Sequence, residues 1–432
     1  MKQFSEDFML GAATASHQVD GNNIHSDYWV QEHLTHSVFK EPSGMAVDHY
    51  SHYEEDIKYL AGAGLNTYRF SIEWARIQPK EDEWEQREVE HYRKVIKCCK
   101  ENGVKPILTL HHFSSPAWLI TKGGWENPEV TVYFEKYCKR VVSELSEELD
   151  GEYICTINEA NMRLQLAALI KDMMKRMAGN SSVKSAESSV QVGVNLAQDN
   201  MMKNAMESAA AFGVDDPRKV ATFVSQCTSE GDLLVMKAHQ AAKAAIKSVN
   251  PNIKVGLTLS LHDMQPYSGG EEFAEKDWED EFTHYLPYIK DDDFLGVQCY
   301  TRKRYDENGV AQPTEGMRRT LSGYEDYPMA IANVVRRVSK QFKNTIIVTE
   351  NGIATDNDKR RCEFIKEACE GIMDCIDDGI NIKGYMYWSL LDNFEWQKGF
   401  DQTFGLIAVD RSTMKRTVKE SLSVLGSLIK KG

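Results

Sequence analysis

The 432-residue chain lacks a basic excess, because its 51 Lys and Arg residues are outnumbered by 65 Asp and Glu residues, for a formal net charge of −14. Nucleic acids and anionic membrane surfaces are bound through basic patches. The composition therefore predicts neither as a partner. The chain also lacks a run of eighteen apolar residues, so no membrane-spanning helix is expected.

Organised cysteines are missing as well. The nine cysteines are an odd number, lie scattered along the chain, and include the neighbours Cys98 and Cys99. We interpret them as reduced thiols. Residues 1–7 lack the apolar segment of a signal peptide, because acidic residues begin at Glu6. These features together predict a cytoplasmic protein.

Motifs for metals and phosphates are also absent. The sequence has no His-Glu-x-x-His motif, no EF-hand loop and no glycine-rich phosphate loop. We therefore expect no metal site and no cofactor.

Short apolar, β-rich segments alternate with amphipathic stretches, a pattern typical of βα units around a parallel sheet. Helices are expected near residues 48–64 and 88–102, which carry apolar residues at three-to-four spacing. No linker or internal repeat divides the chain. Eight βα units most simply close into a barrel, so we predict a single (β/α)8 TIM barrel forming one catalytic domain over residues 1–432. The eight strand candidates are residues 9–14, 66–72, 106–110, 153–157, 254–260, 294–299, 345–349 and 383–389.

Residues 160–230 depart from this pattern, because they are long for one crossover and contain seven of the 17 methionines. One interpretation is helical cover in which flexible methionines fill the core. The other is a mobile wall over the active site that accepts varied apolar groups. The methionines are Met162, Met173, Met174, Met177, Met201, Met202 and Met206.

Polar or aromatic side chains follow seven of the eight strand candidates, where a TIM barrel forms its active site. The fifth strand offers only His262, which receives no assignment. His111 and His112 are neighbours on one strand, so only one of them can face the mouth. The other candidates at the strand ends are Gln18, Arg69, Asn158, Glu159, Tyr300, Glu350, Asn351 and Trp388.

Glu159 and Glu350 each end a run of β-forming residues. A carboxylate at the end of an apolar strand costs free energy unless it is ion-paired or takes part in binding or catalysis. Two carboxylates at one barrel mouth suit glycoside hydrolysis, in which one protonates the leaving oxygen and the other attacks the anomeric carbon or activates water. The residues alone leave a second interpretation open, namely two unrelated salt-bridged glutamates.

Five aromatic residues fall within seventeen positions near the C-terminus, interleaved with Asp392, Asn393 and Glu395. Aromatic faces beside hydrogen-bonding groups suit a bound sugar, and an aromatic core segment is the alternative interpretation. The five are Trp388, Phe394, Trp396, Phe400 and Phe404.

The chain resembles the glycoside hydrolase family 1 β-glycosidases from Phe8 to about Ser421. The resemblance rests on FMLGAATASHQ at residues 8–18, TYRFSIEW at 67–74, TLHHF at 109–113, TINEA at 156–160, VTENG at 348–352 and WSLLDNFEW at 388–396. It implies a TIM barrel and a retaining, double-displacement mechanism. It also implies that Glu350 is the nucleophile and Glu159 the acid/base.

The resemblance implies the remaining site residues too. Asn158 would contact the sugar 2-hydroxyl, and Arg69 and Tyr300 would support Glu350. The other glycone-binding residues would be Gln18, His112, Glu395 and Trp396, with Trp388 as the floor of the site.

The sequence departs from the family pattern at several positions. Ala160 replaces a usual Pro, and Asp20 stands where a Glu is usual. Phe113 replaces a common Trp, and Gln298 and Cys299 replace Asn and Tyr before Tyr300. Gln298 puts the tuning of the carboxylates in doubt, and the unaligned Met-rich segment puts the leaving-group preference in doubt.

We therefore expect hydrolysis of unphosphorylated β-glucosides, with β-galactosides or β-fucosides as further glycones, on a small glycoside or short oligosaccharide. A 6-phospho-β-glycosidase is a rival, but those enzymes typically carry Ser where this chain has Glu395. A thioglucosidase typically lacks the acid/base, which Glu159 supplies. A catalytically weak, sugar-binding relative is the alternative from another class. A homo-oligomer is compatible with the sequence.

Overall fold

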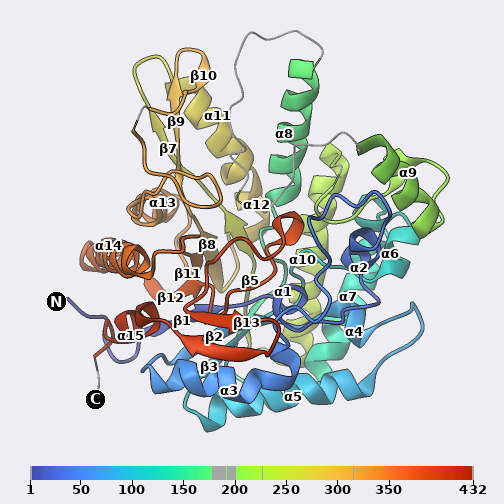
Figure 1. Ribbon diagram of the computed structural model, residues 1–432, viewed down its shortest axis with the longest axis horizontal. Helices are drawn as coiled ribbons and strands as arrows, with labels where there is room; N and C mark the ends of the chain where they lie inside the picture. Colours follow the sequence, from blue (N-terminus) through green and yellow to red (C-terminus); the bar gives the residue numbers. More distant parts are fainter. Residues whose placement is uncertain (1, 178–190, 192–200, 226, 315, 431–432) are drawn as a thin grey trace.

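A computed structural model describes residues 2–177, 191, 201–225, 227–314 and 316–430, and its centre is a barrel of parallel strands (Figure 1). All eight predicted strands are present, the fifth as two consecutive pieces. The strands are β1 (Met9–Ala13), β2 (Thr67–Ser71), β3 (Lys105–Thr109), β4 (Tyr153–Cys155), β5 (Lys254–Gly256) with β6 (Thr258–Ser260), β8 (Phe294–Gln298), β11 (Thr345–Asn351) and β12 (Ile382–Trp388).

The barrel closes through its fifth strand. The order in the sheet is β5-β4-β3-β2-β1-β12-β11-β8-β6, so β5 and β6 stand at its two ends. Only Leu257 separates them: β5 pairs with β4, and β6 pairs with β8. One strand therefore joins both ends of the sheet, which confirms the predicted TIM barrel.

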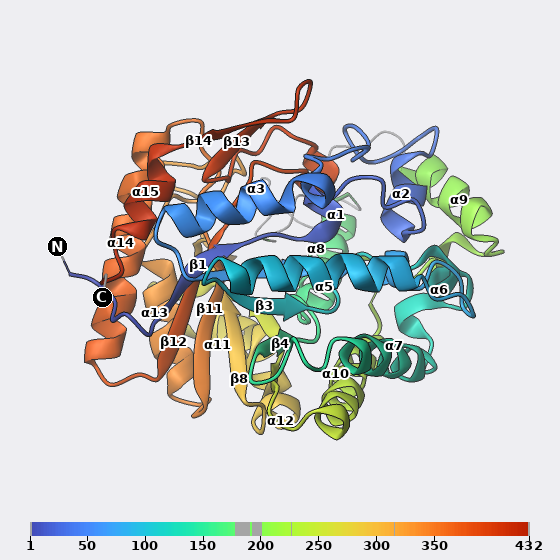
Figure 2. The ribbon, with the colours of Figure 1, turned by 90° about the horizontal axis from the view of Figure 1, so that it is seen from below.

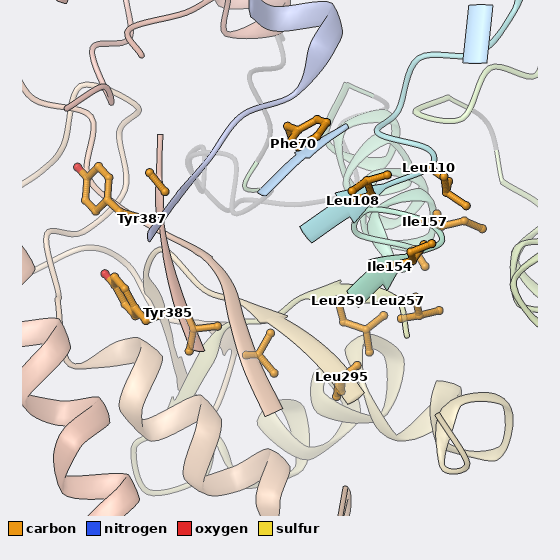
Figure 3. Packing of buried hydrophobic residues seen from close by; sticks show 14 of the residues in the cluster. Phe70, Leu108, Leu110, Ile154, Ile157, Leu257, Leu259, Leu295, Tyr385 and Tyr387 are labelled. Atoms are coloured by element: carbon orange, nitrogen blue, oxygen red, sulfur yellow. The ribbon is translucent and has the colours of Figure 1, made fainter. Parts of the chain in front are cut away.

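Side chains alternate between the two faces of each strand. On one face, Phe70, Leu108 and Leu295 pack in a large cluster of buried side chains that also contains helix residues (Figure 3). On the other face, Met9, Ile107, Phe294, Ile347 and Met386 form a second cluster inside the barrel. The interior is tight at Gly296, because a Cβ there would lie 2.6 Å from Thr258 Cγ2. The barrel is therefore filled below its mouth by apolar side chains.

Helices surround the strands (Figure 2), including α3 (His49–Gly62) and α5 (Gln86–Glu101), which confirm the two predicted helices. The other long helices are α7 (Val130–Glu144), α8 (Met162–Met177), α9 (Met201–Phe212), α10 (Ser229–Val249), α11 (Glu271–Glu281), α13 (Ala330–Ser339) and α14 (Asp358–Asp377). The short ones are α1 (Ser16–Val19), α2 (Asp27–Glu32), α4 (Trp74–Ile77), α6 (Ala117–Thr121), α12 (Leu286–Ile289) and α15 (Glu420–Gly426). Among the described helices, none has the length and apolar character that a membrane crossing requires.

Two small sheets were not predicted from the sequence. One contains β7 (Asp263–Pro266), β9 (Arg302–Asp306) and β10 (Gly309–Val310), and it stands above the barrel at the end where α8 also projects (Figure 1). The other pairs β13 (Ile407–Asp410) with β14 (Lys415–Val418). These strands have two to five residues and little apolar alternation, so they carry no strong periodic signal.

The methionines of residues 160–230 are not a uniform core filler. Met162 is buried, whereas Met201, Met202 and Met206 on α9 are 45%, 76% and 60% exposed. The core-filling interpretation is wrong for these three. Met173, Met174 and Met177 lie on α8, and their side chains are outside the described part of the chain.

Candidate active site

A pocket of about 340 Å³, including the open space at its mouth, lies at the carboxyl ends of the barrel strands. Nine of the ten residues predicted for the site line it, and Arg69 lies directly against one of them. The nine are Gln18, His112, Asn158, Glu159, Tyr300, Glu350, Trp388, Glu395 and Trp396.

Glu350 lies near the end of β11 and is only 3% exposed. Arg69 Nη1 donates a hydrogen bond of 2.6 Å to Glu350 Oε1. The hydroxyl of Tyr300 donates one of 2.5 Å to Oε2. Both oxygens are thus held by donors, which fixes the orientation of the carboxyl group.

Arg69 projects from β2 and is completely buried. Its other donors contact Thr109 Oγ1 at 3.0 Å and Asn158 Oδ1 at 2.6 Å. Because a buried guanidinium needs partners for its donors, these contacts keep it charged and immobile. Arg69 therefore connects Glu350 to Asn158 across the barrel.

Glu159 lies beyond the end of β4, in a left-handed backbone conformation with φ 43°. Its backbone N–H donates to Thr258 Oγ1 at 2.8 Å. Left-handed backbone is uncommon outside glycine and often marks a functional position. Here it occurs at a residue of the pocket wall that is only 2% exposed.

The electrostatic environments of the two carboxyl groups differ. Burial, and then the negative charge of Glu350, raise the pKa of Glu159 well above its usual value, with Ser260 and Arg69 opposing in part. Burial also raises the pKa of Glu350, but the Arg69 charge and the Tyr300 hydroxyl oppose it directly. These environments favour protonation of Glu159 over protonation of Glu350.

Gln298, a departure from the family pattern, is integrated into the site. Its amide donates to Asn158 Oδ1 at 2.9 Å and to Thr258 Oγ1 at 3.1 Å. A hydrogen bond from Gln298 also contributes to lowering the pKa of Glu350. Gln298, which is longer than the usual Asn, thus helps to stabilise the ionised form of Glu350.

The opposite wall carries polar atoms for a polyhydroxylated ligand. The Gln18 amide donates to Phe394 O at 2.7 Å and to Glu395 Oε2 at 3.3 Å. Asn158 and His112 share a hydrogen bond of 3.2 Å. Within the described residues, Gln18 Oε1 and His112 Nδ1 have no protein partner. Both atoms are available for hydroxyl groups.

Aromatic rings frame these polar atoms. The imidazole of His112 stacks on Trp388 at a centroid distance of 5.7 Å and on Trp396 at 6.2 Å. Burial lowers the pKa of His112 well below its usual value, so its ring is neutral. Neutral rings and hydrogen-bonding atoms together suit the apolar faces and hydroxyl groups of a sugar.

Four pocket residues were not assigned from the sequence: Phe113, Gln191, Tyr324 and Phe404. In the sequence, Phe113 directly follows His112, and Phe404 belongs to the aromatic cluster near the C-terminus. Gln191 accepts the backbone N–H of Tyr300 at 2.6 Å, a long-range contact that no local pattern announces. Tyr324 lies between helices and strands and carries no periodic signal.

Other polar candidates lie away from the pocket. His111 hydrogen-bonds Ser115 at 3.0 Å, which confirms that only His112 faces the mouth. His262 pairs with Glu281, and Asn351 donates to the carbonyl of Cys299. Among the described residues, no group of three or more His, Cys, Asp and Glu side chains could hold a metal ion.

Comparison with known proteins places this geometry in a family. The sequence model of glycosyl hydrolase family 1 matches residues 1–185 and 281–432. The crystal structure of the beta-glycosidase BGL167 is 40% identical, with a TM-score of 0.87, covering 98% of this chain and 96% of that one. Beta-glucosidase A of Acetivibrio thermocellus is 28% identical over 97% of this chain and 96% of its own. A 6-phospho-beta-galactosidase of Leptotrichia buccalis is also 28% identical, over 97% of each chain.

Proposed function

The chain belongs to glycosyl hydrolase family 1, and from this membership we propose that it is a retaining β-glycosidase that cleaves unphosphorylated β-glucosides. Glu350 acts as the nucleophile and Glu159 as the acid/base. The proposal rests on the unequal environments of two buried carboxyl groups in one pocket. The guanidinium of Arg69 donates a hydrogen bond to Glu350, and among the described residues no guanidinium does so to Glu159.

In the first step, Glu350 attacks the anomeric carbon as the bond to the leaving oxygen breaks. Glu159 gives its proton to that oxygen, so the aglycone leaves as a neutral alcohol. Burial and the charge of Glu350 support this assignment, because they keep Glu159 protonated. Arg69 supports the nucleophile, because its charge favours the ionised form of Glu350.

In the second step, water attacks the glycosyl ester. The ester has no charge, so the pKa of Glu159 falls, and Glu159 accepts a proton from the water. Glu350 leaves as a carboxylate, and the sugar keeps its anomeric configuration. A retaining mechanism requires a separation of about 5–5.5 Å between the carboxyl groups.

Asn158 and Glu395 are proposed to recognise the glycone. Asn158 Oδ1 already accepts hydrogen bonds from Arg69 and Gln298, which orients its amide for the 2-hydroxyl group. Glu395 is 8% exposed in the pocket wall. A phosphate dianion next to this carboxylate would meet repulsion, which favours an unphosphorylated 6-position.

We also propose that the chain forms one catalytic domain and works in the cytoplasm. All nine cysteines are free thiols, which is what a reducing compartment requires.

Azide rescue tests the catalytic assignment. With 2,4-dinitrophenyl β-glucoside, Glu159→Ala forms the glycosyl-enzyme but hydrolyses it slowly, because the general base is missing. Azide needs no deprotonation, so it restores turnover and gives a β-glycosyl azide. In Glu350→Gly, azide displaces the leaving group directly and gives an α-glycosyl azide. Proton NMR identifies the anomers, and the opposite pair of products would reverse the two roles.

A further inference from the structure

Gln191 is a buried residue of the catalytic pocket that the two-step mechanism does not use. It is 7% exposed and lines the pocket wall. It also lies outside the two ranges that the family model matches. Family membership therefore assigns it no role, and its function has to be inferred from its contacts.

The side-chain amide of Gln191 makes three hydrogen bonds among the described residues. Its Oε1 accepts the backbone N–H of Tyr300 at 2.6 Å, and its Nε2 donates to Ser260 Oγ and to the carbonyl of Leu261, each at 3.1 Å. Ser260 is the last residue of β6, and Tyr300 follows β8, the strand that pairs with β6. The amide therefore bridges two neighbouring strand ends at the barrel mouth.

These contacts fix the orientation of the amide. An amide nitrogen carries two hydrogens, and here each has an acceptor at the end of β6. The reversed orientation would place this nitrogen against the N–H of Tyr300, where two donors would face each other. The nitrogen has no hydrogen left for a sugar hydroxyl group, so the contacts favour a role in holding the wall over a role in binding the substrate.

Tyr300 connects this bridge to the proposed nucleophile. Its hydroxyl donates to Glu350 Oε2 at 2.5 Å, and Glu350 lies on β11, which flanks β8 on the side away from β6 (Figure 1). The tyrosine is thus anchored to β6 by its backbone and reaches β11 with its side chain. A movement of its backbone would shift the hydroxyl away from the carboxyl group.

We propose that Gln191 is a positioning residue whose amide anchors Tyr300 to β6 and thereby directs the tyrosine hydroxyl group to Glu350. The inference rests on the proposed function, in which Glu350 is the nucleophile. Burial raises the pKa of Glu350, and the hydrogen bond from Tyr300 opposes this effect. Accurate placement of Tyr300 therefore helps to keep Glu350 ionised and aligned for attack.

Other charged or titratable groups face Glu350 as well. Arg69 on β2 donates to its other oxygen, and the charge of Glu350 also acts on the side chains of Glu159 and Cys155. Among the described residues, Gln191 forms no hydrogen bond with any of these three. A substitution of Gln191 should therefore reach Glu350 through Tyr300.

Gln191→Leu tests the inference, because leucine has a similar volume and no hydrogen-bonding group. The substrate is 2,4-dinitrophenyl β-glucoside, whose leaving group scarcely needs a proton, so the acid limb of kcat/KM reports the ionisation of Glu350. We expect this limb to move up by about half a pH unit to one pH unit, because a weakened hydrogen bond stabilises the carboxylate less. The value of kcat/KM at the optimum should fall about tenfold, less than the loss of about 10²–10³-fold for a donor that is removed outright.

A double variant shows whether the effect passes through the tyrosine. Tyr300→Phe removes the hydroxyl and should move the acid limb up by about one to two pH units. Gln191→Leu added to Tyr300→Phe should move it no further, because the group that Gln191 directs is already gone. Such non-additivity in the pH profile is expected of a positioning role and not of a general loss of stability.

Gln165→Leu is the matched control. The amide nitrogen of Gln165 donates to the backbone carbonyl of Ser260 at 2.8 Å, and Gln165 is half-buried and does not line the pocket. The substitution removes the same group from the same strand end without a contact to Tyr300, so the acid limb should stay in place. Gln191→Asn provides the measurement should Gln191→Leu not fold. Its side chain is one methylene group shorter, so it cannot span β6 and Tyr300 and should shift the acid limb in the same direction.

The outcomes separate this inference from the catalytic assignment. An acid limb that is unchanged in Gln191→Leu, or that moves equally in Gln165→Leu, would overturn the positioning role and leave the hydrolase intact. A further shift in the double variant would contradict the route through Tyr300. Ser260 also hydrogen-bonds Glu159, so a shift confined to the alkaline limb with phenyl β-glucoside would assign Gln191 to the acid/base and overturn the inference. Absence of turnover by the unmodified protein would overturn the proposed function, and the inference with it.

Discussion

Glu350 and Glu159 are identical side chains in one pocket, yet the protein holds them in opposite ways. Glu350 lies on a barrel strand, and each of its oxygens accepts a hydrogen bond of 2.5–2.6 Å. Glu159 lies past a strand end, in left-handed backbone, and Arg69 acts on it only at longer range. A fixed cation and a hydroxyl donor, placed beside Glu350 and not beside Glu159, thus give two identical side chains different electrostatic environments.

Removing the guanidinium of Arg69 should abolish the difference between the two carboxyl groups, and we expect this substitution to lower activity the most. Arg69→Met leaves Glu350 buried without its charge partner, so its pKa rises and it becomes protonated near neutral pH. We expect kcat/KM to fall by about 10³-fold or more, since one preorganised donor alone is worth 10²–10³. Stability should fall by about 3–5 kcal/mol, the usual result of breaking a buried pair. Initial rates and urea unfolding measure the two effects.

Arg163→Met is the control for this experiment. Arg163 is equally buried and pairs with Glu126, but it does not line the pocket. The control should lose stability and keep the pH dependence of its rate. If Arg163→Met changed the pH profile as Arg69→Met does, the effect would belong to burial in general and not to the contact with Glu350.

The pH dependence of the rate should distinguish the two carboxyl groups. Glu350 must be ionised, so activity is lost as pH falls through its pKa. Glu159 must be protonated, so activity is lost as pH rises through its pKa, which lies higher because burial and Glu350 raise it. From the proposed roles we therefore expect a bell-shaped profile of kcat/KM against pH.

Glu159→Gln should remove the alkaline limb alone. The rate with an unactivated aryl glucoside should fall by about 10²–10⁴-fold, the usual contribution of a general acid. A dinitrophenyl glucoside, whose leaving group scarcely needs a proton, should lose far less in the first step. An alkaline limb that persisted unchanged would assign the acid to another group.

The sequence predicted the residues at the strand ends better than it predicted contacts between distant parts of the chain. Eight apolar segments predicted the barrel, because strand periodicity is a local signal. The polar residues at the strand ends placed Arg69, Glu159 and Glu350 at its mouth, whereas the roles expected for them came from the family resemblance. Gln191 and Tyr324 were missed, because their positions depend on contacts between residues far apart in the chain. The departure at Gln298 was recognised, but its contacts to Asn158 and Thr258 depend on packing across the barrel.

Thr258 is where the two regions meet. Its hydroxyl oxygen accepts the backbone N–H of Glu159 at 2.8 Å and the amide of Gln298 at 3.1 Å. The same hydroxyl donates to Asn158 Oδ1 at 3.2 Å. Thr258 is fully buried on β6. One hydroxyl group therefore links the loop that carries Glu159 to Asn158 and Gln298, which lie in the hydrogen-bond network around Glu350.

Thr258→Val keeps the shape of the side chain and removes only the hydroxyl. The N–H of Glu159 would then be buried without a partner, which costs about 1–3 kcal/mol. Thr349→Val is a matched control on the neighbouring part of the barrel, because Thr349 is equally buried and its hydroxyl has no partner among the described residues. That substitution should be neutral or slightly stabilising, since it removes a polar group that makes no hydrogen bond. Urea unfolding should separate the two variants by at least about 1 kcal/mol.

Thr258→Val should also reduce kcat with little change in KM, because it loosens the proposed acid/base Glu159 and leaves Gln18 and Trp396, on the proposed sugar-binding wall, in place. Equal stability of the two variants would mean that Glu159 is held by its own loop and that its link to Thr258 is incidental.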